Sequence, residues 1–507
     1  MLFATAGSLA PASEGAAASL PYFAWLGQWM PLPFFHTPAF LVFFALVATV
    51  YWLTPRRFVS VRTWILVVAS FHFYAAWSAE LAFLVTATAT VDNLLARGMA
   101  TTERRKIRLG LMVTSIVMNL AILCYFKYSN FFLDSLNAAL KAAGAGSAFE
   151  TLKIIVPFGI SFYTFEAISY AVDVYRKKIQ AERSLPAFLL FILFFPHLVS
   201  GPIVRAGDFL PQVHRRKRWN WLRVQVGVQF FLMGAFKKLA LGDRFAMFCD
   251  PVWSDPAAYN TSATWLAVLA YALRIYFDFS GYSDMAIGSA HLLGFKLTQN
   301  FNMPYLAANV SEFWRRWHIS LSTWLRDYLF IPLGGSRGST WATNRNLMIT
   351  MILGGLWHGA TWSFAIWGAL HGIFLVVHRL FQSFVSTRPN WKTALGTAQG
   401  TAFRTLITIF CVGLAWVFFR KDLAGALTIF QHLFTLHAGL GPPMPNRMLW
   451  TLLGFVAFCH WFMASGTWRT VWPKLPAELQ GFAYATCLIV AMILAPDQSQ
   501  SFIYFDF

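Results

Sequence analysis

Long apolar runs, separated by short polar joins, follow one another along most of the chain. An α-helix that crosses a bilayer needs about 20 apolar residues, and several of the runs are shorter, so that we expect some segments to be tilted or partial. The runs are residues 39–54, 62–77, 80–96, 109–126, 154–174, 223–241, 262–284, 347–377, 403–420, 448–465 and 480–496. The pattern predicts an all-α polytopic membrane protein, a single integral-membrane domain over residues 1–507, with about 11–13 transmembrane or re-entrant segments.

Basic residues between the runs predict the orientation of the chain. Lys and Arg cluster at residues 56–62 and 97–108, whereas the N-terminal segment 1–38 contains neither. Cytoplasmic loops of multi-pass proteins carry the excess of Lys and Arg. We therefore expect both clusters on the cytoplasmic side and residues 1–38 on the outer side.

A shorter run, residues 186–200, lies between two further basic clusters at 176–178 and 205–218. Basic flanks on both sides of so short a run favour a re-entrant segment over a full crossing. Pro196, Gly201 and Pro202 predict broken backbone, which is tolerated at membrane depth only beside protein or a water-filled cavity. We expect this segment to line a cavity that opens to the cytoplasm.

The composition agrees with a membrane protein and narrows its partners. Of the 507 residues, 57% are hydrophobic and 12% charged, against about 25% charged in a soluble domain. The net charge of +19 could suggest nucleic acid, but basic clusters that flank apolar runs favour a role in topology. The five cysteines lack metal-binding spacing, and no P-loop, nucleophile elbow or H-E-x-x-H motif occurs. We expect the lipid bilayer as a partner, no nucleic acid and no metal.

Residues 309–335 combine an apolar stripe with a second, polar face. Asn309 and Glu312 have the spacing of a helix start, and the stripe is typical of a helix lying in the membrane interface. The stripe consists of Phe313, Trp317, Leu321, Trp324 and Tyr328, and the second face of Arg315, His318, Ser322 and Arg326. The second face could bind an anion such as a nucleotide phosphate, or its arginines could anchor the helix to lipid headgroups. The spacing favours neither.

The run 347–377 is too long for one straight crossing. As a single helix it would measure about 46 Å, against a hydrocarbon core of about 30 Å, so it must tilt or break, and its glycines offer places to break. His358 would then lie near the midplane, where an ionisable side chain is costly and is by default a functional candidate. The alternative is a neutral histidine bonded to a neighbouring helix. We expect His371, further along, to be structural.

Residues 271–288 carry three charged side chains within an apolar run. Arg274 and Asp278 are four residues apart and could pair on one helix face. Asp284 could orient a histidine or bond to broken backbone. A buried polar network without a catalytic role explains the same pattern at least as well.

Six blocks of the sequence are long and distinctive enough to be compared with the motifs of known families. They are PFGISFYTFEAISYAVDVYR at 157–176, FFPHLVSGPIVR at 194–205, YFDFSGYSDMAIG at 276–288, NFNMPY at 300–305, SEFWRRWHISLSTWLRDYLFIPLGG at 311–335 and GGLWHGATWSFAIWG at 354–368. They resemble the membrane-bound O-acyltransferase family, most closely its bacterial branch that acylates alginate and teichoic acid. The closing FIYFDF resembles the alginate-type C-terminus.

The resemblance implies a ring of tilted helices around a thin centre, with a tunnel from a cytoplasmic donor site to an external acceptor site. His318 in WRRWHIS and His358 in GGLWHGA match the family's two essential histidines, and His358 matches the central catalytic one. The implied reaction is acetyl transfer from a cytoplasmic donor, most simply acetyl-CoA, to an exopolysaccharide hydroxyl. Periplasmic partner subunits would complete the transfer outside a bacterial inner membrane. Candidate contacts to donor or substrate are Arg315, Ser322, Arg326, Trp357, Asp278 and Asp284.

Two other functional classes stay open. A transporter of polysaccharide or lipid-linked sugar would use Arg274, Asp278 and Asp284 as a polar pathway. Such transporters usually have repeated halves, which this sequence lacks. A non-catalytic scaffold for a synthase gains nothing from two intact histidine motifs.

Overall fold

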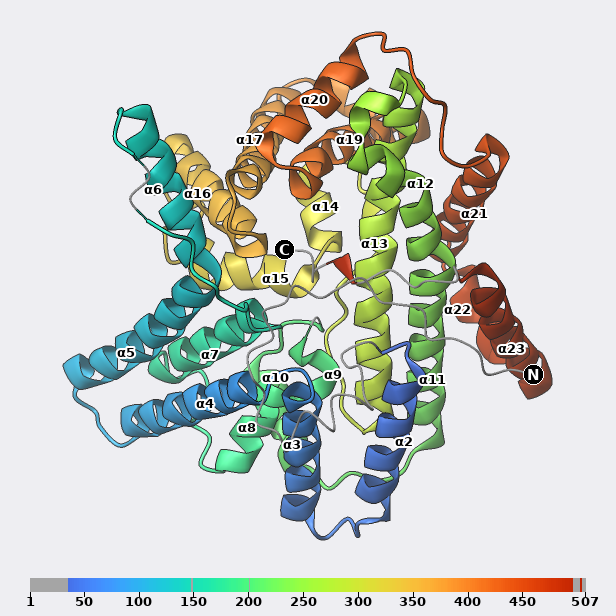
Figure 1. Ribbon diagram of the computed structural model, residues 1–507. Helices are drawn as coiled ribbons and strands as arrows, with labels where there is room; N and C mark the ends of the chain where they lie inside the picture. Colours follow the sequence, from blue (N-terminus) through green and yellow to red (C-terminus); the bar gives the residue numbers. More distant parts are fainter. Residues whose placement is uncertain (1–34, 147–148, 200, 496–501, 504–507) are drawn as a thin grey trace. The chain divides into compact units, whose positions relative to one another are not determined.

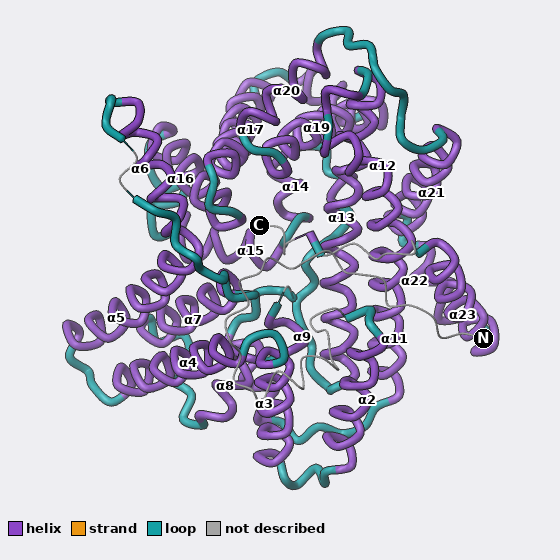
Figure 2. The backbone as a smooth tube through the Cα atoms, in the orientation of Figure 1, coloured by secondary structure: helices purple, strands orange, loops and turns teal. Residues whose placement is uncertain are grey.

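The computed structural model describes residues 35–146, 149–199, 201–495 and 502–503. Within these ranges the chain is helical, and the only β-pairing is an isolated bridge between Tyr259 and Leu440 (Figure 2). The prediction of an all-α protein is confirmed. Of the N-terminal segment predicted to lie on the outer side, residues 1–34 fall outside the described residues.

Seven helical stretches of the described chain are long and apolar enough to cross a membrane. They are Ala79–Ala100, Arg105–Ala142, Trp221–Ser254, Trp362–Ser386, Ala398–Arg420, Arg447–Ala464 and Ala477–Leu494. Four shorter apolar helices are Pro38–Leu53, Val59–Ala75, Leu185–Leu198 and Leu423–Phe434. The chain is therefore a multi-pass membrane protein, in which several apolar helices are shorter than a full crossing, as the sequence predicted.

The chain forms two compact units, and the first contains the residues up to Ile160 together with Val174–Phe195. Its helices are α2 (Pro38–Leu53), α3 (Val59–Ala75), α4 (Ala79–Ala100), α5 (Arg105–Leu123), α6 (Ser129–Ala142) and α8 (Leu185–Leu193). Helices α3 and α4 pack against α8 and against each other. Within this unit Asp92 of α4 accepts hydrogen bonds from Ser115 and Asn119 of α5. These bonds satisfy a carboxyl group that is buried among apolar helices.

The run 186–200 contains the broken backbone that its prolines predicted. Helix α8 ends at Leu193, Phe194 is not helical, and the four-residue α9 covers Phe195–Leu198. Neither piece is long enough to cross a membrane alone.

The second unit contains Ser161–Asp173, which is most of α7 (Ile160–Tyr175), and the chain from Pro196 onward. Its helices are α10 (Ala206–His214), α11 (Trp221–Phe236), α12 (Asp243–Ser254), α13 (Thr261–Leu292), α14 (Val310–Arg316), α15 (Ile319–Leu325), α16 (Thr340–His358), α17 (Trp362–Ser386), α18 (Pro389–Gly396), α19 (Ala398–Arg420), α20 (Leu423–Phe434), α21 (Asn446–Ala464), α22 (Thr467–Val471) and α23 (Ala477–Leu494). Helix α13 has 32 residues and is buried along most of its length, with α11 and α12 packed against it (Figure 1).

Glycines set the close approach of α11 to α13. A Cβ atom on Gly234 would lie 2.5 Å from the carbonyl oxygen of Gly281, and one on Gly288 would lie 2.6 Å from that of Gly227. Real Cβ contacts are never that short, so larger residues would force the helices apart. Small residues at helix crossings are typical of membrane proteins, because they allow the backbones to approach closely.

Helices α16 and α17 form an antiparallel pair that accounts for the long apolar run. The run breaks immediately after His358, at Gly359–Thr361. A Cβ atom on Gly355 would lie 2.2 Å from the carbonyl oxygen of Phe364, so the two helices touch directly beside the break. Of the two predicted alternatives, tilt or break, the structure has the break, which places His358 at the end of a helix.

The segment 309–335 is not one helix, contrary to the prediction. Asn309 caps α14 as expected, because its side chain accepts a hydrogen bond from the Glu312 backbone N–H. Helix α14 nevertheless ends at Arg316, and α15 begins at Ile319. Between them His318 has a φ of 41°, in the left-handed region, which interrupts the helix.

Candidate active site

The two candidate histidines lie next to each other in the second unit. His318 sits at the break between α14 and α15, and His358 is the last residue of α16. Their ring centroids are 6.2 Å apart, and the two residues are 0% and 3% exposed. Two backbone breaks thus bring side chains 40 positions apart in the sequence into one buried site.

Aromatic side chains surround the histidine pair. The His318 ring lies 4.7 Å from the ring of Phe279 and 5.8 Å from that of Trp357. The His358 ring lies 5.1 Å from Trp367. Trp357 is held in place because its indole N–H donates to the backbone oxygen of Ser161 at 3.1 Å. These rings exclude bulk water and lower the local dielectric around the imidazoles.

His318 is a neutral imidazole without a protein partner. Both ring nitrogens are buried and lack a hydrogen-bond partner in the described structure. Burial lowers the pKa of His318 to about 3, since the charged form loses its hydration and gains no counter-charge. The seven-residue helices on either side are too short to span a membrane. Both nitrogens of His318 therefore keep their hydrogen-bonding capacity, one as a donor and the other as an acceptor.

Asn300, in the NFNMPY block, fixes the strained turn at His318. Its backbone oxygen accepts from the Ile319 N–H at 2.9 Å. Its side-chain oxygen accepts from the Ser320 N–H and hydroxyl at 3.2 and 2.7 Å. The Ser320 oxygen in turn accepts from the Ile203 N–H at 3.0 Å. A left-handed non-glycine residue costs about 1–3 kcal/mol and persists only when its surroundings determine it, which these bonds do.

The predicted polar face of segment 309–335 does not form. Arg315 and Arg326 are exposed, whereas His318 is fully buried. Arg315 donates to Ser311, and Arg326 donates to its neighbour Asp327. Because the break at His318 interrupts the helical spacing, the arginines do not make an anion site with the histidine.

The apolar stripe of the same segment also differs from the prediction of an interfacial helix. Phe313, Trp317, Leu321 and Trp324 are buried within the protein, and Ser322 donates its hydroxyl to the backbone oxygen of Trp317. The Trp317 ring packs 5.0 Å from Trp416 of α19. The stripe therefore forms core around the histidines and is not a lipid-facing surface.

The charged residues of α13 form ion pairs with α12 and with the π-helical turn Lys237–Gly242. Arg274 donates to Asp250 and does not pair with Asp278, as the spacing had suggested. Asp278 instead binds Lys238 at 2.6 Å, and Asp284 binds Lys237 at 2.6 Å.

The sequence interpretation missed Lys237 and Lys238, although two lysines inside an apolar run are a signal in themselves. Lys238 also binds Asp243 at 2.8 Å, and the three side chains of this buried cluster are at most 3% exposed. The π-helical turn after α11 aims both lysines at α13. Asp278 and Asp284, proposed as substrate contacts, are thus occupied by protein cations.

The described end of the chain packs against the same site. The Ile503 backbone N–H donates to Asp278 at 2.7 Å. The Phe502 ring stacks on Tyr282 at 4.2 Å and lies 6.0 Å from Phe279, the ring that contacts His318. The Lys238–Asp278 pair therefore also holds residues 502–503 beside the aromatic cage, the rings of Phe279, Trp357 and Trp367 around the two histidines.

His371 is buried one turn beyond Trp367 on α17. Its Nδ1 accepts a hydrogen bond from the Trp314 indole N–H at 3.3 Å. Among the described residues no three His, Cys, Asp or Glu side chains come together as a metal ion would require. The chemistry that the arrangement supports is proton transfer by the buried His318–His358 pair.

Comparisons with known proteins show the family of this chain. Residues 106–415 match the family model described as the membrane-bound O-acyltransferase family. A protein of Azotobacter vinelandii named probable alginate O-acetylase is 42% identical over 397 residues, 76% of this chain and 75% of that one. The peptidoglycan O-acetyltransferase of Helicobacter pylori is 35% identical over 438 residues, 80% of each chain.

A more distant relative is the teichoic acid D-alanyltransferase of Bacillus subtilis, 29% identical over 239 residues, 45% of this chain and 60% of that one. The match to the family model includes both histidines, the aromatic cage and the paired helices α16 and α17. The chain belongs to the membrane-bound O-acyltransferase family.

Proposed function

We propose that this acyltransferase moves acetyl groups from a cytoplasmic thioester donor to a hydroxyl group on the outer side of the membrane. The observation that carries the proposal is the pair of buried imidazoles, His318 and His358, whose ring centroids are 6.2 Å apart among aromatic side chains. Relatives named as alginate and peptidoglycan O-acetylating enzymes support acetyl as the group transferred.

In the proposed reaction His358 is the general base. It removes the proton of the attacking hydroxyl, whose oxygen bonds to the carbonyl carbon of the acetyl thioester. The C–S bond then breaks, and the departing thiolate takes up the proton from His358. The neutral His318 ring can donate a hydrogen bond to the carbonyl oxygen as negative charge develops there. Trp357, adjacent to both rings, fixes the orientation of the imidazoles and forms a wall of the donor site.

We assign acetyl-CoA as the donor, the bacterial inner membrane as the location and an exopolysaccharide as the final acceptor. Periplasmic partner subunits complete the transfer to the polymer. The names of the relatives support the polysaccharide, and the multi-pass helices support transfer across a membrane. Arg315 and Arg326 are exposed and away from His318, so a role for them in binding the donor phosphates is confined to the protein surface.

The ion pairs of α13 argue against the transporter alternative. It required Arg274, Asp278 and Asp284 to line a polar pathway, but each is ion-paired to a side chain of the protein. Family membership supports an enzyme over a transporter or a scaffold.

Polysaccharide acetylation in cells tests the proposal. The gene and its neighbouring partner genes are expressed in a bacterium that lacks its own acetyltransferase, and acetyl esters on the exported polymer are measured by NMR. Wild type should restore the esters, and His358→Ala should not, at equal protein in the membrane. The exposed His214 provides a matched control, and His214→Ala should behave like wild type. Normal acetylation with His358→Ala would contradict the assignment of the base.

A further inference from the structure

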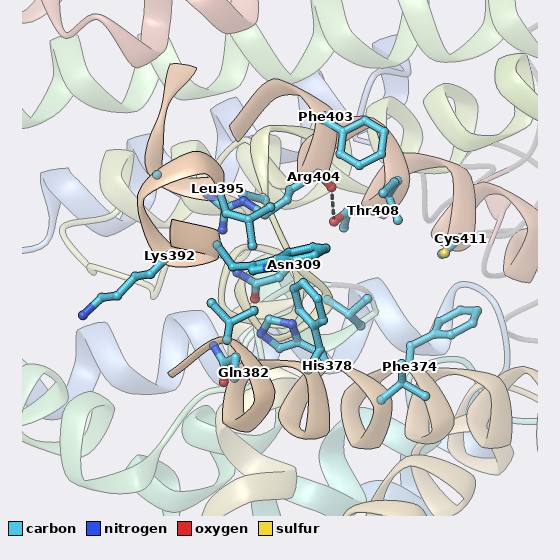
Figure 3. A pocket seen from close by; sticks show the side chains of 18 of the residues that line it. Asn309, Phe374, His378, Gln382, Lys392, Leu395, Phe403, Arg404, Thr408 and Cys411 are labelled. Carbon is cyan, nitrogen blue, oxygen red and sulfur yellow. Dashed lines mark hydrogen bonds between the residues drawn. The ribbon is translucent and has the colours of Figure 1, made fainter. Parts of the chain in front are cut away.

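A cavity lies outside the histidine site, between α17 and α19 (Figure 3). The two helices touch where Trp367 stacks on Trp416, with ring centroids 5.6 Å apart. Beyond this contact the cavity lies between residues 374–386 of α17 and residues 403–411 of α19, with α18 and the start of α14 completing its walls. Its volume is about 760 Å³, within the range of sites that bind small molecules.

The walls of this cavity are mainly apolar. Side chains of Phe374, Val377 and Phe381 line it from α17, and Phe403 and Ile407 line it from α19. Four of these, Val377, Phe381, Phe403 and Ile407, are exposed. Because α17 and α19 are both long and apolar enough to cross a membrane, an occupant with an alkyl chain fits these walls.

The polar groups of the cavity are basic or neutral. Arg404, Lys392 and His378 lie among its lining residues, all of which the structure describes, and none of these residues is acidic. Within the described part of the chain, Arg404 donates only to the preceding turn of its own helix, to the Gly400 backbone oxygen at 3.4 Å and to Thr401 Oγ1 at 3.2 Å.

An arginine on an apolar helix without an acidic partner is costly, and an anion beside it removes that cost. In Figure 3 His378 lies inside the ring of lining side chains, whereas Lys392 reaches outward from the rim.

We propose that this cavity binds an anionic membrane phospholipid. The phosphate would lie at Arg404, near the rim with Lys392, and an acyl chain would follow Phe381 and Val377 inward to Phe374. The absence of an acid in the lining favours a net negative headgroup over a zwitterionic one, because a choline group would bring an unpaired cation close to Arg404. The apolar walls favour a lipid over free phosphate in solution. The site is separate from the acetyl-transfer chemistry and is an independent ligand site.

Lipid retention by the purified protein tests this proposal. The protein is exchanged into nanodiscs that contain equal parts of phosphatidylglycerol and phosphatidylcholine with identical acyl chains, and retained lipid is counted by native mass spectrometry. Wild type should retain phosphatidylglycerol preferentially. Arg404→Gln should reduce that preference by about fivefold, the contribution of one basic residue near a membrane surface. Arg379 lies on α17 but does not line the cavity. Arg379→Gln also removes one positive charge, and it should leave the preference for phosphatidylglycerol unchanged.

Two further arms separate the alternatives. Ile407→Trp narrows the apolar part of the cavity and should reduce retention of both lipids. Free glycerol phosphate in the buffer should not displace the bound lipid, and displacement would show a site for soluble phosphates instead. An equal loss of preference in Arg379→Gln and Arg404→Gln, or no preference in wild type, would overturn the proposal.

Discussion

Replacing Lys238 by Met should strongly destabilise the second unit. The Lys238 ammonium binds Asp278 at 2.6 Å and Asp243 at 2.8 Å, and it is 1% exposed. Its removal leaves two carboxylates close together, with neither water nor a cation to compensate them. Breaking a buried pair by removing one partner costs about 3–5 kcal/mol, and the higher figure is expected here because two acids lose their partner. The change in unfolding free energy is measured on the protein in detergent, either by titration with SDS or by thermal inactivation.

Lys237→Met is the control for this prediction. Lys237 binds Asp284 at 2.6 Å, but the two side chains are 20% and 10% exposed, so this pair is less fully buried than the Lys238 cluster. We expect a loss of about 1.5–3 kcal/mol. Adding Asp243→Asn and Asp278→Asn to Lys238→Met should recover part of the lost stability, since no uncompensated charge remains. Equal losses in the two single variants, or no recovery in the triple variant, would refute the argument from burial.

Two other perturbations test the geometry of the site. Gly355→Ala would place a Cβ atom 2.2 Å from the Phe364 carbonyl oxygen, so α16 and α17 must separate and His358 must shift; transfer activity should fall about 100-fold, the cost of a displacement of 1 Å. Gly454→Ala, at a position with open space, should retain activity, and a tolerated Gly355→Ala would contradict the close contact. Because burial lowers the pKa of His318 to about 3 from an unfolded value of about 6.5, the unfolded chain binds more protons between these values, and stability is lost as the pH falls below 6.5. Thermal unfolding at pH 7.5 and 5.5 measures how much unfolding free energy each protein loses on acidification. This loss should be about 1.4 kcal/mol smaller in His318→Gln than in wild type, and equal losses in the two proteins would contradict the buried neutral ring.

The features of this protein that depend on hydrophobic length were predictable from its sequence. The 347–377 run exceeded the bilayer thickness, which predicted a tilt or a break, and its glycines offered places for a break. The structure has that break at Gly359–Thr361. The apolar runs likewise predicted the helical membrane architecture, because each run must satisfy its backbone internally.

Features that depend on distant parts of the chain were not predictable. The periodicity of 309–335 is helical throughout, and the break at His318 is imposed by Asn300, whose side chain bonds to Ser320. The ion pairs of α13 likewise depend on residues from another part of the chain. The spacing of Arg274 and Asp278 allowed a pair within one helix, but Lys238 is brought to Asp278 by a π-helical turn that no local pattern revealed.

Acetyl transfer by the purified protein tests the central claim most directly. The protein and its partner subunits are reconstituted in nanodiscs with radiolabelled acetyl-CoA, and label on partner or polysaccharide is measured for wild type, His318→Ala, His358→Ala and the surface control His214→Ala. We expect label with wild type and His214→Ala, a strong reduction with His318→Ala, and none above background with His358→Ala. Label with His358→Ala at the wild-type rate would contradict the role of the buried histidine pair in acetyl transfer.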